Sequence, residues 1–60
     1  MYFDKTLTNC TNSRALYAEL KRFGLNVTDM GREVYVYGEI EAKQYDTIIR
    51  ICAEYGDIED

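Results

Sequence analysis

The amino-acid sequence predicts a single α+β domain spanning residues 1–60, of order β-α-β-β-α, in which two helices cover one face of a three-stranded sheet. Two observations carry this prediction. Residues 25–37 alternate apolar and polar side chains on both sides of Asp29-Met30-Gly31, which is typical of a β-hairpin. Apolar residues also recur with helical spacing within residues 13–23 and within residues 41–55, which indicates two amphipathic helices.

The first element is a strand expected at residues 2–8. Alternation along this strand places Phe3 and Leu7 toward the core, and Tyr2 and Asp4 on the opposite face of the sheet. Tyr2 and Asp4 are therefore candidates for an exposed surface.

The second element is a helix expected at about residues 13–23, where Leu16, Leu20 and Phe23 form one apolar stripe. Gly24 suits the position just after a helix, because glycine adopts a left-handed conformation without steric cost. Three side chains before the first turn could cap it: Thr11, Asn12 and Ser13.

The hairpin supplies the third and fourth elements. Val27 on the first arm and Val34 and Val36 on the second face the same core. Gly31 can take the positive φ that a tight turn requires. A right-handed crossover would connect the first strand to the first arm of the hairpin if those two strands pair in parallel.

The last regular element is a helix expected at residues 41–55, with Ile48 and Cys52 on its apolar stripe and Glu39 and Glu41 near its start. Gly56 should end it. Residues 57–60 could form either a short strand around Ile58 or a frayed acidic end, and the sequence does not decide between the two. This order resembles a ferredoxin-like unit whose last strand is missing or reduced to Ile58, and the resemblance implies that one sheet face is uncovered.

The net charge of −4 is unevenly distributed along the chain. Residues 1–31 carry four basic and three acidic side chains, whereas residues 32–60 carry three basic and eight acidic side chains. An acidic surface repels nucleic-acid phosphates and attracts basic protein surfaces. We therefore expect a protein partner with a basic surface and no direct binding of nucleic acid.

Catalytic and metal-binding patterns are weak. The sequence has no histidine, so it lacks the usual general base, and two cysteines alone do not make a zinc site. We expect no enzyme activity, no cofactor and no metal, although Cys10 precedes a helix and could be a reactive thiolate instead of a half-buried side chain. The start of the chain lacks an apolar signal region and no stretch reaches transmembrane length, so we expect a cytoplasmic protein with free thiols and no membrane contact.

The uncovered sheet face is the candidate functional surface. One interpretation is that its tyrosines only stiffen an exposed sheet through cross-strand contacts. The other is an interface of aromatic anchors ringed by carboxylates, used on a basic protein or on a second copy as a homodimer. RNA stacking on the aromatics is disfavoured, because the charge is acidic and residues 32–37 lack the basic-glycine-aromatic pattern of RNA-recognition domains. The candidate partner-binding residues are Tyr2, Asp4, Glu33, Tyr35, Tyr37 and Glu39.

In general character the chain resembles small acidic phage-encoded inhibitors, such as anti-CRISPR proteins and DNA mimics. The resemblance rests on the acids of residues 33–60 together with Tyr35, Tyr37, Tyr45 and Tyr55, and on no motif. It implies that carboxylates replace phosphates in the basic channel of a nucleic-acid-handling partner, which the protein inhibits or regulates. The alternative is a homo-oligomeric structural or regulatory domain that uses the same face on itself.

Overall fold

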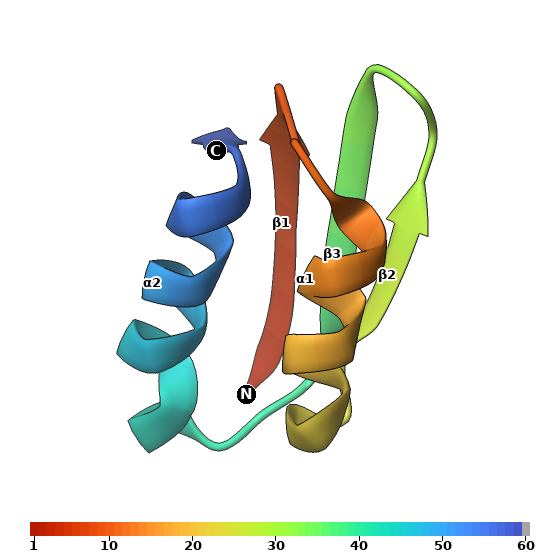
Figure 1. The fold of residues 1–60 in the computed structure, drawn as a ribbon. Helices are drawn as coiled ribbons and strands as arrows, with labels where there is room; N and C mark the ends of the chain where they lie inside the picture. Colours follow the sequence, from red (N-terminus) through yellow and green to blue (C-terminus); the bar gives the residue numbers. More distant parts are fainter. Residues whose placement is uncertain (60) are drawn as a thin grey trace.

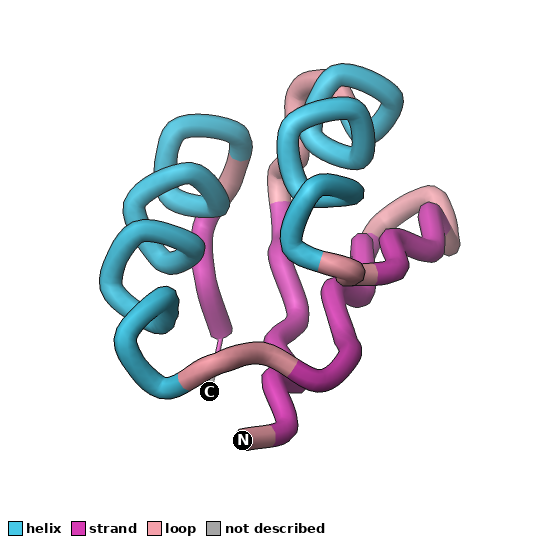
Figure 2. The backbone as a smooth tube through the Cα atoms, turned by 90° about the horizontal axis from the view of Figure 1, so that it is seen from below, coloured by secondary structure: helices cyan, strands magenta, loops and turns pink. Residues whose placement is uncertain are grey.

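The computed structural model describes residues 1–59 and shows two helices on one face of a four-stranded sheet (Figure 1). Seen from below, both helices lie on the same side of the strands, and the opposite side of the sheet carries no helix (Figure 2). The regular elements are β1 (Tyr2–Thr8), α1 (Ser13–Leu20), β2 (Asn26–Asp29), β3 (Glu33–Glu39), α2 (Tyr45–Tyr55) and β4 (Asp57–Glu59), with short 3-10 turns η1 (Lys21–Phe23) and η2 (Ala42–Gln44).

The sheet has the strand order β2-β3-β1-β4, and every neighbouring pair is antiparallel. The expected three-stranded sheet is therefore wrong by one strand, because β4 pairs with β1. The parallel pairing on which the right-handed crossover was conditional does not occur, because β3 lies between β1 and β2. The hairpin pairs with β1 through β3, in a seven-residue ladder that begins with Tyr2 opposite Glu39 and ends with Thr8 opposite Glu33. Strand β2 therefore lies at the edge of the sheet.

The sequence alone does not predict the fourth strand, because this strand is only three residues long. Ile58 lies opposite Leu7 and packs half-buried against the core, while its two acidic neighbours point the other way. A single apolar residue between acids carries too little periodicity to be distinguished from a frayed end.

Helix α1 begins where the sequence predicts and ends in a tightened last turn. The side chain of Asn12 caps it by accepting a hydrogen bond from the Ala15 N–H at 3.0 Å. The helix then narrows into η1, and Gly24 ends it in the left-handed conformation at φ 81°, as expected. The Gly24 N–H donates to the Lys21 carbonyl at 2.9 Å, which satisfies a carbonyl of that last turn.

The start of the last helix differs from the prediction. Glu39 does not lie at a helix start but is the final residue of β3, because the strand continues through Gly38. Glu41 instead caps η2 in a reciprocal pair with Gln44, and α2 follows from Tyr45. The helical prediction for residues 41–55 is otherwise confirmed.

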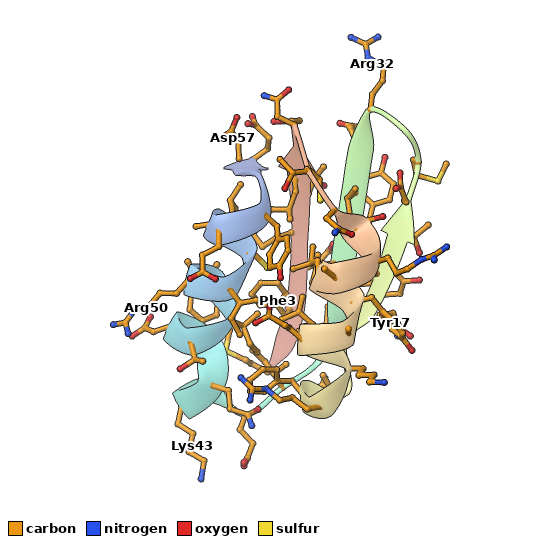
Figure 3. The ribbon with its side chains drawn as sticks, viewed as in Figure 1. Phe3, Tyr17, Arg32, Lys43, Arg50 and Asp57 are labelled. Atoms are coloured by element: carbon orange, nitrogen blue, oxygen red, sulfur yellow. The ribbon has the colours of Figure 1, made fainter. Side chains whose placement is uncertain are left out.

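The core lies between the helices and the sheet, where Figure 3 shows Phe3. No helix within residues 1–59 is long and apolar enough to cross a membrane. The buried core consists of Phe3, Leu7, Leu16, Leu20, Leu25, Val34, Val36, Ile40, Ile48, Ile51 and Cys52.

Candidate docking face on the open sheet

Strand alternation and register define the sheet surface opposite the helices, which we call the open face. Residues that are cross-strand neighbours share one face, so the register assigns each position. All six residues predicted from the sequence lie on this face, and six further residues join them. The open face consists of Tyr2, Asp4, Thr6 and Thr8 of β1, Asn26 and Thr28 of β2, Glu33, Tyr35, Tyr37 and Glu39 of β3, and Asp57 and Glu59 of β4.

Tyrosines and carboxylates are interleaved on the open face. Tyr2 lies opposite Glu39, and Asp4 lies opposite Tyr37. The third pair runs along one strand, where the Tyr35 hydroxyl donates to Glu33 Oε1 at 3.0 Å. Each of the three rings therefore has a carboxylate beside it.

The charge of the open face is negative. It carries five carboxylates, and no lysine or arginine within residues 1–59 occupies one of its strand positions. Lys5 lies on the helix-covered side, opposite Val36, and Figure 3 shows Arg32 extending from the hairpin end and Arg50 extending from α2. One positive group reaches the border of the face, because the Met1 amino group lies 3.3 Å from Glu39 Oε2. The face therefore attracts cations.

Two of the tyrosines are held at their hydroxyl ends. The Tyr37 hydroxyl is hydrogen-bonded to Thr28 Oγ1 at 3.1 Å, across β3 and β2. The hydrogen bond from Tyr35 to Glu33 favours the protonated phenol and raises the pKa of Tyr35. Both rings are half-buried against the sheet, whereas Tyr2 is 58 % exposed.

Strand β4 adds two acids that the sequence did not assign to the face. Glu59 Oε2 accepts from Thr8 Oγ1 at 3.2 Å, and Asp57 Oδ2 accepts from Asn9 Nδ2 at 2.9 Å. Figure 3 shows Asp57 at the end of the sheet near the chain terminus. The alternation of these two acids with Ile58 was the sequence signal that could have assigned them to the face. Asp60 lies outside the described residues.

The remaining tyrosines of the inhibitor resemblance do not belong to this face. Tyr45 packs against Phe3 with ring centroids 5.7 Å apart, on the helix-covered side. The Tyr55 hydroxyl donates to Glu19 and ties α2 to α1. That bond raises the pKa of Tyr55, and desolvation adds to the shift. Only Tyr35 and Tyr37 of the four tyrosines are therefore available to a partner at the open sheet.

A polar hollow of about 590 Å³ lies where β1 ends beside the hairpin turn. Cys10 is half-buried and lies in the lining of this hollow. Cys52 is instead buried in the core, where desolvation raises the pKa of its thiol to about 11. No cluster of three potential metal ligands occurs within residues 1–59. The hollow is lined by Thr8, Asn9, Cys10, Gly31, Arg32 and Glu33.

Comparison with known proteins identifies no family and no relative for this chain. No protein-family model matches the chain, and neither the curated proteins nor the solved structures contain a significant match. The functional argument therefore rests on the residues of the face itself.

Proposed function

We propose that this protein is a small binding module, without catalytic activity, that inhibits or regulates a larger basic-surfaced partner in the cytoplasm. The partner is a protein that handles nucleic acid, as for the anti-CRISPR type of inhibitor. One observation carries the proposal: the open face combines five carboxylates with three tyrosines and no lysine or arginine within residues 1–59.

The chemistry of this surface favours a cationic protein over nucleic acid. Phosphates would meet five carboxylates without the lysine and arginine side chains whose counterion release drives nucleic-acid binding. The negative electrostatic field of the open face would instead attract a basic protein surface and orient it as the two proteins approach. Tyrosine supplies apolar contact area with a polar tip, which is why it is frequent in protein interfaces.

The topology supports a more specific description of the fold. The strand order β2-β3-β1-β4 with both helices on one face fits a ferredoxin-like unit that includes its fourth strand. RNA-recognition domains place aromatics on the corresponding open sheet, so an absent last strand no longer separates this chain from them. The acidic charge and the missing basic-glycine-aromatic pattern still do.

A second copy of the chain is a less suitable occupant. Two open faces packed against each other would bring five carboxylates from each copy into one interface. Like charges in an interface cost free energy unless each is paired. The same face is therefore better matched to a partner of opposite charge.

A pair of charge-matched variants tests the proposal. Glu33→Lys changes the open face, whereas Glu54→Lys makes the same charge change on the exposed surface of α2. We expect the unmodified chain and Glu54→Lys to capture the same basic nucleic-acid-handling protein from nuclease-treated cell extract, identified by mass spectrometry and released by salt. Glu33→Lys and Tyr35→Ala should each lose it.

Equal capture by all variants would show that the open face is not the binding surface. A chain that captures no such protein and sediments as a concentration-dependent dimer would favour the homo-oligomeric function instead. Folding of each variant is checked by its thermal unfolding, so that lost capture is not mistaken for lost structure.

A further inference from the structure

We infer that the open face recognises arginine side chains of its partner in preference to lysine. This inference rests on the proposed function and adds the chemistry of the contact. It is carried by the way in which two tyrosine rings are oriented beside carboxylates.

The hydrogen bond between Tyr37 and Thr28 sets the orientation of one ring. The Thr28 hydroxyl sits close to its own backbone, whereas the Tyr37 hydroxyl is at the far end of its ring. The two oxygens are 3.1 Å apart, so the ring leans over β2 along the sheet instead of standing away from it. The half-buried state of Tyr37, in contrast to exposed Tyr2, agrees with this orientation.

A ring that leans along the sheet presents its outer face to the partner. Such a face accepts a flat group by stacking, and the negative quadrupole of the ring favours a cation. Tyr35 is restrained in a similar way by its bond to Glu33. Both rings are therefore ordered before a partner arrives, which lowers the entropy cost of binding.

The neighbouring carboxylates require the stacked group to be a hydrogen-bond donor as well. Asp4 lies directly opposite Tyr37, and Glu33 is bonded to Tyr35. A guanidinium is flat, permanently charged and able to donate two parallel hydrogen bonds to a carboxylate while it stacks on a ring. A lysine ammonium is a compact point charge that gains the attraction but not the stacking or the paired bonds.

Flat nucleobases would also stack on such rings, but they arrive with phosphates. The five carboxylates of the face repel the phosphates of a nucleic acid. Within residues 1–59, no lysine or arginine occupies a strand position of the face to offset this repulsion. Planarity together with positive charge selects the arginine side chain.

Two peptides test the inference, an arginine-glycine repeat and a lysine-glycine repeat of equal length and charge. We expect the arginine peptide to bind the unmodified chain at least about fivefold more tightly by calorimetry, which is the scale of one or two ring–cation contacts at an exposed site. Tyr37→Leu should remove this preference, and Tyr35→Leu should reduce it. Tyr17→Leu, at an exposed tyrosine on α1 (Figure 3), should leave it unchanged.

The outcomes separate this inference from the proposed function. Equal affinity of the unmodified chain for both peptides, with loss of both in Glu33→Lys, would overturn the arginine preference and leave a basic-surface binder. No binding of either peptide, or binding that Glu33→Lys leaves intact, would overturn both. Backbone amide shifts in NMR spectra should move on β1 and β3 and not on α1.

Discussion

Gly56 approaches the backbone of Thr8 so closely that a Cβ atom at this position would lie 2.9 Å from the Thr8 carbonyl oxygen. The φ of Gly56 is extended, so the requirement for glycine here is the space between two backbones and not a special dihedral angle. This contact allows the chain to leave α2 and immediately join β1 as β4. It thereby brings Asp57 and Glu59 onto the open face.

Gly56→Ala should therefore destabilise the fold by about 1–3 kcal/mol, because the added methyl group overlaps a backbone atom that cannot rotate away. Urea unfolding measures the change. Ala53→Ser, at an exposed position of the same helix, should change the free energy of unfolding by less than about 0.5 kcal/mol. A Gly56→Ala variant as stable as the unmodified chain would mean that β4 does not dock on β1 as described.

Substitutions of Tyr45 and of Tyr2 should distinguish a tyrosine that stabilises the fold from a tyrosine that is exposed on the open face. Tyr45→Ala removes a ring that packs against Phe3 in the core and should cost about 2–4 kcal/mol of unfolding free energy. Tyr2→Ala removes an exposed ring and should cost about 0.5 kcal/mol or less. Similar losses in both variants would contradict the assignment of Tyr2 to an uncovered face.

The two cysteines should differ in reactivity. Burial raises the pKa of Cys52 to about 11, so this thiol holds little thiolate near neutral pH and should resist alkylation in the folded chain. Cys10 is half-buried and should be modified first by iodoacetamide. Mass spectrometry of the partly labelled protein locates the added group, and equal labelling of both residues would contradict the burial of Cys52.

The same shift predicts a loss of stability in alkaline solution. The pKa of Cys52 is raised from 9.0 to about 11 in the folded chain, so above pH 9 the unfolded chain releases a proton that the folded chain retains. The protonated Cys52 thiol therefore makes its full contribution to the free energy of unfolding below pH 9. This contribution is lost as the pH rises toward 11, by at most about 1.4 kcal/mol per pH unit. Cys52→Ala should lose this part of the pH dependence in urea unfolding experiments.

Asp29 should titrate below its ordinary value because two donors favour its ionised form. The Ser13 hydroxyl donates to Oδ2 at 2.7 Å and the Gly31 N–H donates to Oδ1 at 2.8 Å, and both bonds lower the pKa of Asp29 from 3.8, with the Ser13 bond as the larger cause. The stability that Asp29 contributes is present above pH 3.8 and lost as the pH falls through the folded value. NMR titration should find that Ser13→Ala raises the Asp29 pKa and that Thr47→Ala does not.

The order β-α-β-β-α and five of the six strand and helix positions followed from local physics that the sequence determines by itself. Alternation over residues 2–8 and 33–37 and the apolar stripes of both helices need only the periods of the strand and the helix. Gly24 marked a helix end for the same reason, since a left-handed residue is cheap only for glycine. Alternation also placed five of the six candidate residues on one face, whereas Glu39 was expected near a helix start and lies on that face because β3 continues to it.

Only the tertiary structure decided which strands are neighbours and whether the last residues form a strand. A pairing between distant segments leaves no mark in a local pattern, so β3 could replace β2 beside β1 without any change in periodicity. Strand β4 is three residues long and exists because Ile58 finds Leu7 across the sheet. The inhibitor resemblance grouped Tyr45 with Tyr37, but the structure separates them. Tyr45 packs against Phe3 on the helix-covered side, and Tyr37 lies on the open face, where its hydroxyl is hydrogen-bonded to Thr28.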